Sequence, residues 1–119
     1  MQVQILKSKL HHARLTSCDL DYEGSLAIDL DLMDAVGMFP FEKILVVNQT
    51  NGQRLETYAI PAERGSRTFC LNGAAARRGE PGDMVTIMSF GTLPAEDAAG
   101  LKARVAILDK DNRIEATRN

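Results

Sequence analysis

The sequence predicts a small, mainly β domain: a closed barrel of short strands with a few short helices. Two observations predict this fold class. Short apolar stretches that alternate with polar residues recur at close spacing, and turn-forming pairs such as Asn51-Gly52 and Pro81-Gly82 separate them. The chain has 119 residues, with no internal repeat, low-complexity segment or linker. We therefore expect residues 1–119 to form a single domain.

The first part of the chain predicts two strands and a helix. Residues 2–10 alternate between polar and apolar, as in a half-buried strand, and a second short strand is expected around residues 27–28. Over residues 29–37, acidic residues come first and Gly37 stands where a left-handed C-terminal cap belongs. This pattern predicts one short helix.

A β-hairpin gives the clearest local signal. Residues 44–47 are aliphatic, Asn51-Gly52 is the favoured two-residue turn, and residues 53–60 alternate again. The pattern predicts two antiparallel strands joined by a tight turn. Pro61 is expected to end the second strand.

The rest of the chain predicts three further strands and two helical segments. The strands are expected at residues 68–71, 84–90 and 105–108. A turn at residues 72–76 enters a helical turn, and Pro94 suits the first position of a helix that runs through Ala99. Residues 109–119 are mostly polar, and we expect them to fray.

Composition excludes several classes of protein. Hydrophobic residues make up 45% and charged residues 25%, which excludes a disordered chain, and the absence of Trp predicts an aliphatic core. The net charge of -2 argues against a nucleic-acid-binding module, a DNA-binding β barrel included, because such domains carry a basic excess. No apolar stretch reaches the roughly 18–20 residues that span a bilayer, and residues 1–10 lack a signal-peptide apolar block. We therefore expect a cytoplasmic protein with no membrane or nucleic-acid partner.

Residues that could bind a metal or undergo redox chemistry do not have the spacing of a site. His11 and His12 are adjacent, so a regular strand would point them to opposite faces, and no third ligand is suitably spaced. The three aspartates of residues 29–34 lack the glycine of a calcium loop, and helix capping explains them better. Cys18 and Cys70 form no Cys-x-x-Cys motif and are expected to be small core residues.

Two features are open to both a chemical and an ordinary structural interpretation. Arg54 and Tyr58 share one face of the second hairpin strand, where they either place an anion-binding group beside a phenol or form exposed cross-strand pairs. A serine after a glycine can attack the preceding carbonyl and leave a pyruvoyl group, but the same pair is common in turns. The chain has two such pairs, at residues 24–25 and 65–66.

Ten segments, in order and without a large gap, match one known family. They are residues 9–11, 19–25, 27–29, 50–52, 54, 57–60, 62–66, 72–76, 82–83 and 89–90. Each segment alone is weak, but the ordered set is specific. Through this set the chain resembles bacterial aspartate 1-decarboxylase.

The resemblance implies a six-stranded double-psi β barrel and an enzyme that cuts itself between Gly24 and Ser25. Ser25 would become a pyruvoyl cofactor that binds the substrate amine as a Schiff base, while residues 1–24 stay bound to residues 25–119. The resemblance further implies decarboxylation of L-aspartate to β-alanine and CO2 for pantothenate and coenzyme A synthesis. It also implies a homotetramer with active sites between subunits, and some relatives need a maturation factor.

The resemblance also implies roles for single residues. Tyr58 matches the proton donor, and Arg54 and Lys9 match the residues that bind the substrate carboxylates. Thr57 matches a residue of self-cleavage and substrate binding. Strict alternation places Thr57 on the face opposite Arg54 and Tyr58, so a common pocket needs a bulge or a second subunit. The remaining matches are Gly73, Ala74 and Ala75, which cradle the substrate, and the pocket or processing residues His11, Tyr22 and Asn72.

Two positions depart from the family pattern. Many members have Trp where this chain has Val47, and a small residue where it has Leu26, whose bulk next to the cleavage site can change the cleavage rate. The alternative function is a double-psi barrel that never cleaves and serves as a binding or regulatory module. The presence of Lys9, Arg54 and Tyr58 together argues against that alternative, because a binding module has little need of all three.

Overall fold

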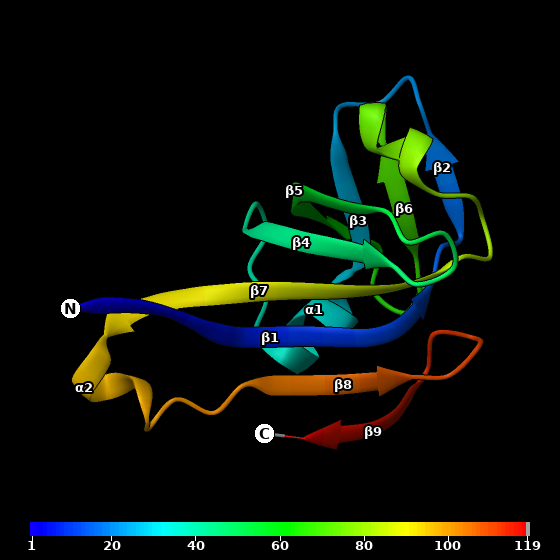
Figure 1. The fold of residues 1–119 in the computed structure, drawn as a ribbon. Helices are drawn as coiled ribbons and strands as arrows, with labels where there is room; N and C mark the ends of the chain where they lie inside the picture. The colour runs from blue at the N-terminus through cyan, green and yellow to red at the C-terminus, as the bar shows by residue number, and fades with distance from the viewer. Residues whose placement is uncertain (119) are drawn as a thin grey trace.

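The computed structural model describes residues 1–118, which form nine strands and three short helices (Figure 1). The strands are β1 (Gln2–Arg14), β2 (Ser17–Asp19), β3 (Ser25–Asp29), β4 (Lys43–Asn48), β5 (Arg54–Ala62), β6 (Phe69–Asn72), β7 (Met84–Pro94), β8 (Arg104–Leu108) and β9 (Ile114–Arg118). The helices are α1 (Leu30–Val36), the 3₁₀ helix η1 (Gly73–Arg78) and α2 (Ala95–Ala98). The expected mainly β structure with a few short helices is confirmed.

The strands form one hydrogen-bonded order, β2-β6-β3-β5-β4-β7-β1-β8-β9. The six central strands run from β6 to β1 in this order. These two strands are joined by hydrogen bonds between Phe69 of β6 and Thr16, which lies two residues after the end of β1. The Thr16 N–H donates to the Phe69 carbonyl over 2.8 Å, and the Phe69 N–H donates to the Thr16 hydroxyl over 3.0 Å. The six strands therefore close into a small barrel, with the strand number expected for a double-psi barrel, and β2, β8 and β9 lie outside these six.

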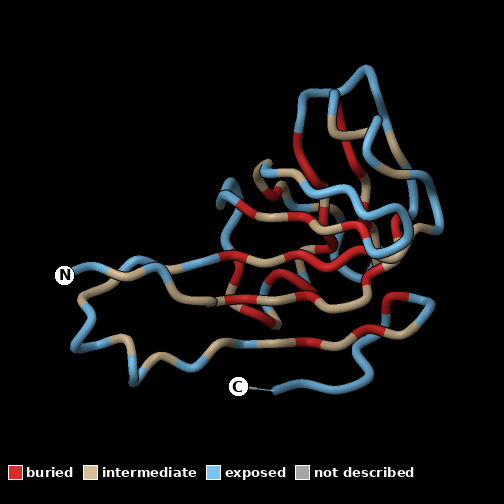
Figure 2. The backbone as a smooth tube through the Cα atoms, in the orientation of Figure 1, coloured by how far each residue is buried: buried red, intermediate tan, exposed pale blue. Residues whose placement is uncertain are grey.

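The core of the barrel is aliphatic, as the composition predicts. Among the buried side chains that the structure describes, Phe69 alone is a Phe, Tyr or Trp. Buried residues concentrate in the middle of the molecule, whereas the start of β1, the α2 segment and β9 are largely exposed (Figure 2). Burial of each large aliphatic side chain contributes about 1.5–3 kcal/mol. Fully buried examples are Leu10, Leu26, Ile28, Ile44, Val46, Val85 and Ile87.

Helix α1 begins and ends as predicted. The buried Asp29 caps its start by accepting the Asp31 N–H over 2.8 Å, and Gly37 ends it in the left-handed conformation at φ 71°. The Asp29 carboxylate also accepts the N–H groups of Gly65 and Arg67, over 3.1 and 2.7 Å. One carboxylate therefore fixes both the start of α1 and the turn that precedes β6.

The hairpin of β4 and β5 is confirmed, but its connection is longer than the expected two-residue turn, because the Asn48 N–H donates to the Gln53 carbonyl over 2.8 Å and residues 49–52 lie between them. Pro61 also does not end the second strand. β5 continues to Ala62, and Pro61 lies opposite Ile28 in the parallel ladder with β3. The pairing of β4 with β5 stops at Tyr58, so at Pro61 one side of β5 has no partner in that ladder. A proline is tolerated there because its missing N–H is not required.

The polar end of the chain does not fray as expected. Residues 114–118 form β9, which pairs antiparallel with β8, while position 119 lies outside the described residues. All five side chains of β9 are exposed, so no buried apolar face holds this strand in place. Backbone hydrogen bonding to β8 creates it.

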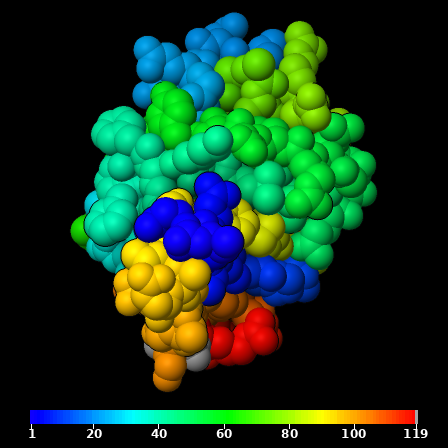
Figure 3. Space-filling view, turned by 60° about the vertical axis from the view of Figure 1, so that its left-hand side comes forward, coloured from blue at the N-terminus to red at the C-terminus, as the bar shows by residue number. Residues whose placement is uncertain are grey.

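The N-terminus packs against the α2 segment at one end of the molecule (Figure 3). The Ala95 N–H donates to the Met1 carbonyl over 2.9 Å, and Gln2 lies opposite Pro94 in the β1–β7 ladder. This pairing carries β7 beyond the predicted end at residue 90, and α2 starts after Pro94 rather than at it. Within residues 1–118, no helix is long and apolar enough to cross a bilayer.

Candidate functional site

Ser25 is the first residue of β3, between the parallel partner β5 and the antiparallel partner β6. Its side chain is fully buried. Asn72, its partner across the ladder in β6, donates its Nδ2 hydrogen to Ser25 Oγ over 3.0 Å, and Ser25 Oγ donates to the Glu23 carbonyl over 3.1 Å. The hydroxyl next to the Gly24–Ser25 peptide is therefore held by one donor and one acceptor, away from water.

The backbone at Gly24 is approached closely by Gly73, the first residue of η1. Gly73 has φ 66°, and a Cβ there would lie 2.7 Å from both Cα and N of Gly24 and 2.9 Å from the Tyr22 carbonyl. Only glycine fits this position without displacing backbone. Gly24 itself is exposed, and a Cβ on it would meet nothing within 4 Å. The peptide between Gly24 and Ser25 thus lies at the boundary of open space and the protein interior.

A pocket of about 330 Å³ opens beside Gly24, and we call it the Gly24 pocket. Its volume is within the range of small-ligand sites, roughly 300–1,000 Å³. β5 contributes one wall and η1 the other. The lining residues are Gly24, Leu55, Glu56, Thr57, Ala74, Ala75 and Arg78.

Four of the site residues expected from the sequence line the Gly24 pocket, and three others do not. Gly24, Thr57, Ala74 and Ala75 line it together, whereas Lys9, Arg54 and Tyr58 do not. Leu55, Glu56 and Arg78 were not among the expected residues. Arg78 lies outside every matched segment, and its only sequence signal is its place in the helical turn after residues 72–76.

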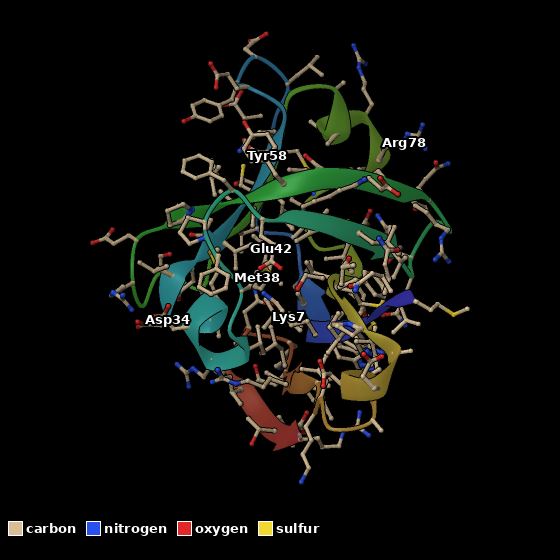
Figure 4. The ribbon with its side chains drawn as sticks, turned by 90° about the vertical axis from the view of Figure 1, so that its left-hand side faces the viewer. Lys7, Asp34, Met38, Glu42, Tyr58 and Arg78 are labelled. Atoms are coloured by element: carbon tan, nitrogen blue, oxygen red, sulfur yellow. The ribbon has the colours of Figure 1, made fainter. Side chains whose placement is uncertain are left out.

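Tyr58 and Arg54 lie on β5 but not in the Gly24 pocket, although Glu56, between them on the same face of the strand, lines it. The Tyr58 ring stacks with Phe41 at a centroid distance of 6.2 Å, and Arg54 is exposed. Figure 4 shows Tyr58 well apart from Arg78, which belongs to the pocket. No bulge brings Thr57 and Tyr58 to one face, because the β4–β5 register is continuous from Arg54 to Tyr58.

Lys9 lies on β1 and lines a different cleft of about 470 Å³, together with Lys102 and Arg118. This cleft shares no lining residue with the Gly24 pocket. The three expected substrate-binding or proton-donating side chains, Lys9, Arg54 and Tyr58, therefore do not join Gly24 within this chain.

His11 and His12 do not point to opposite faces, contrary to the expectation. β1 is irregular between Leu10 and Ala13, and His12 has φ 63°, so the two rings stack with centroids 3.6 Å apart. The pKa of His11 is lowered, first by burial and then by the positive charges of His12 and Lys9. Among residues 1–118, no three His, Cys, Asp or Glu side chains gather as a metal site requires.

The remaining expected residues surround the Ser25 peptide at different depths. Asn72 is buried, and its Oδ1 accepts a weak hydrogen bond from Cys70 Sγ at 3.2 Å. Tyr22 is 54% exposed in the loop before Gly24. Leu26, one of the two departures from the family pattern, is fully buried, so its bulk faces the core rather than the Gly24 pocket. Both cysteines are free and partly buried.

Comparison with known proteins identifies the family. The sequence model described as "Aspartate decarboxylase" matches residues 1–115. Proteins named "Aspartate 1-decarboxylase" are similar to the chain: one from Thioalkalivibrio sulfidiphilus is 52% identical over 98% of this chain and 93% of the relative, and one from Phenylobacterium zucineum is 50% identical over 97% and 98%. Another, from a Geobacillus species, is 50% identical over 93% of this chain and 87% of the relative. The chain belongs to the aspartate decarboxylase family.

Proposed function

We propose that this protein is a self-processing aspartate 1-decarboxylase, which converts L-aspartate to β-alanine and CO2 with a pyruvoyl group made from Ser25. Its relatives of about 50% identity carry that name. The observation that carries the proposal is the buried Ser25 hydroxyl, held by Asn72 beside an exposed Gly24 that opens onto a pocket. This arrangement fits a serine that acts on its own backbone.

Self-cleavage begins when Ser25 Oγ attacks the Gly24 carbonyl, which forms an ester and breaks the peptide C–N bond. Loss of the Ser25 α-proton then expels Gly24 as a carboxylate and leaves dehydroalanine. Water replaces the nitrogen, ammonia leaves, and a ketone remains at the head of residues 25–119. Thr57, in the pocket wall beside Gly24, is suited to donate to the oxyanion of the first step, and one such donor contributes about 3 kcal/mol.

The surroundings of Ser25 fit a pyruvoyl group, because the residue is buried beside the Asn72 amide, a donor that the new ketone could use once Oγ has left with Gly24. The group supplies a carbonyl that condenses with an amine and accepts the electron pair released with CO2. The chain's own residues then position the substrate and supply a proton. The Tyr58 hydroxyl is proposed to deliver that proton to carbon. Arg54 and Lys9 are proposed to bind the two carboxylates.

We infer that Tyr58 and Arg54 act in the pocket of a neighbouring copy, within a homotetramer. The Gly24 pocket of one copy contains Thr57 but neither Tyr58 nor Arg54, and a second copy can supply both. The exposed Phe39 and Phe41, beside Tyr58, give this face the apolar surface that subunit contacts use. The proposed enzyme acts in the cytoplasm and supplies β-alanine for pantothenate synthesis.

Trapping with borohydride tests this function. Purified protein incubated with L-aspartate should release β-alanine, and borohydride added together with aspartate should inactivate it and add the reduced substrate to residues 25–119. Borohydride with β-branched valine in place of aspartate serves as the control and should add no amino-acid mass. If cleavage requires a maturation factor, purified protein will gain activity only after that factor is added from a cell extract. Failure of aspartate to be trapped by fully cleaved protein would contradict the proposal, and a chain that stays uncut even with the extract would favour the binding module.

A further inference from the structure

A second cleft lies away from the Gly24 pocket and is lined mostly by basic side chains. It measures about 770 Å³ and lies where the end of β1, the turn before β6 and the β8–β9 connection come together (Figure 1). It shares no lining residue with the Gly24 pocket. Four cationic side chains line it against the single carboxylate of Asp111, and we call it the basic cleft. The cations are Arg14, Arg67, Lys110 and Arg113.

Asn112 holds the walls of the basic cleft together. This buried residue has φ 61° in the β8–β9 connection. Its Oδ1 accepts the Arg14 N–H over 2.7 Å, and its Nδ2 donates to the carbonyls of Arg14 and Arg67, each over 3.0 Å. The Arg67 N–H in turn donates to Asp29 over 2.7 Å. The backbones that carry the two arginines are therefore fixed before any ligand binds, which lowers the entropic cost of binding.

The positive charge of the basic cleft is not neutralised within residues 1–118. The ion pairs described there join Lys7 with Glu42, Lys43 with Glu56, and Arg64 with two aspartates, and none includes a cation of the cleft.

In addition, Arg14 Nε is buried and has no acceptor among the residues that the structure describes. A buried guanidinium N–H without an acceptor is costly, and an anion in the cleft would satisfy it.

The carboxylates near the basic cleft do not cancel its charge. Asp109, adjacent to the cleft, already accepts the backbone N–H groups of Arg113 and Asp111. These hydrogen bonds, and then the charges of Arg113 and Arg67, hold the pKa of Asp109 below its usual value. With Asp111, Asp109 and the buried Asp29, which accepts the Arg67 N–H, all counted, four cations face three carboxylates.

We propose that the basic cleft binds a small phosphorylated anion at a site separate from the Gly24 pocket. Guanidinium groups match phosphate oxygens in a bidentate geometry, and three arginines face this cleft. Its volume is typical of a small-ligand site. The net charge of the whole chain is -2, so the positive potential is local and suits a small anion better than a nucleic acid. This inference does not depend on self-cleavage or decarboxylation.

Calorimetric titration of the full-length protein with inorganic pyrophosphate tests the basic cleft. We expect one pyrophosphate per chain, with an affinity that falls as ionic strength rises. Arg113→Gln should weaken binding about tenfold, because it removes one charge-assisted contact. Arg113 is exposed and only its backbone N–H makes a described hydrogen bond, so the variant should fold normally. Citrate at equal ionic strength should bind more weakly than pyrophosphate.

Two matched variants provide controls. Arg77→Gln removes an exposed guanidinium outside the cleft, and Arg54→Gln removes one from the proposed substrate-binding set. Both should bind pyrophosphate like the wild type. The proposal is overturned if the wild type shows no saturable binding, or if either control weakens binding as much as Arg113→Gln. Equal affinity for citrate would overturn the assignment of a phosphorylated ligand.

Discussion

The chain contains two Gly-Ser pairs, and their surroundings differ. Ser25 is fully buried and accepts a hydrogen bond from Asn72. Ser66 is exposed in a turn, where Gly65 adopts φ 80°. Both hydroxyls donate to a backbone carbonyl, two residues earlier for Ser25 and three residues earlier for Ser66. A contact between hydroxyl and carbonyl is therefore not what distinguishes a reactive pair from a turn.

Burial and a side-chain donor distinguish the two pairs. In the interior, the hydrogen bonds of a hydroxyl are stronger and do not exchange with water, so the Ser25 hydroxyl keeps one orientation. At Ser66, water competes for the same groups. Gly24 also borders a pocket whose walls come from β5 and η1. Long-range packing, rather than the dipeptide, therefore distinguishes the proposed cleavage site from the turn.

Replacement of the two serines gives the largest expected difference. Ser25→Ala should abolish cleavage, because the attacking hydroxyl is gone, while Ser66→Ala should cleave like the wild type. A denaturing gel after prolonged incubation distinguishes one band from two. Two fragments from Ser25→Ala would move the cleavage site elsewhere.

Replacement of Gly73 and of Gly65, two glycines with positive φ, tests the close contact between the backbones of Gly73 and Gly24. Gly73→Ala places a methyl group 2.7 Å from the Gly24 backbone, so it should prevent most cleavage and lower stability by more than about 2 kcal/mol. Gly65→Ala has the same backbone strain but open space around it, and should cost about 1 kcal/mol without loss of cleavage. Fragment yield and urea denaturation measure the two effects. Similar cleavage by both variants would mean that the contact with Gly24 is unimportant.

Replacement of Tyr58 separates cleavage from turnover. Tyr58→Phe should cleave normally, because Tyr58 lies outside the Gly24 pocket, yet lose about 10²–10⁴-fold in kcat as the proton donor is removed. Phe41→Leu, which removes only the ring stacked on Tyr58, should cost far less. Measurement of β-alanine formation by the cleaved protein gives kcat for both variants. Full kcat in Tyr58→Phe would remove Tyr58 as the acid.

The hydrogen bond from Asn72 is expected to affect the rate of cleavage rather than whether cleavage occurs. Asn72→Ala should slow cleavage roughly tenfold, because the buried Ser25 oxygen loses its donor. Cys70→Ala removes the other partner of Asn72 but keeps that donor, and should cleave at the normal rate. Fragment formation followed over time gives both rates. Equal slowing in the two variants would assign the effect to general loosening of β6.

The smallest expected effect is on the pH dependence of stability, to which His11 contributes. Its pKa in the folded protein is lowered from 6.5, so below about pH 6.5 the unfolded chain binds a proton that the folded chain does not. Stability should therefore fall as pH falls through this window, and level off below the folded pKa. His11→Gln should reduce this dependence in urea denaturation. An unchanged pH dependence in the variant would show that other groups cause it.

Local signals in the sequence predicted the elements whose ends are set by neighbouring residues. Asp29 and Gly37 are caps of α1, and Asn51-Gly52 forms a turn, because each acts within a few residues of its own position. β9 and the continuation of β5 through Pro61 could not be predicted in this way, because distant partners create them. The stacking of His11 on its neighbour likewise depends on an irregularity in the β1–β7 ladder.

The candidate site, too, could be predicted from the sequence only in part, because distant segments form it. Resemblance placed Gly24, Thr57 and the residues around Ala74 in one functional set, and the structure brings them to one pocket. Arg78 was missed because nothing near it in the sequence has the pattern of a motif. The basic cleft was missed because its cations come from three separate segments, which only the buried side chain of Asn112 brings together.

The intact mass of purified wild-type protein tests the central claim most directly. Self-cleavage predicts two species: residues 1–24 with a free carboxyl group on Gly24, and residues 25–119 lighter than a serine-headed chain by one ammonia and resistant to N-terminal sequencing. A single species with the mass of the uncut chain, after long incubation and with a maturation extract supplied, would contradict the account.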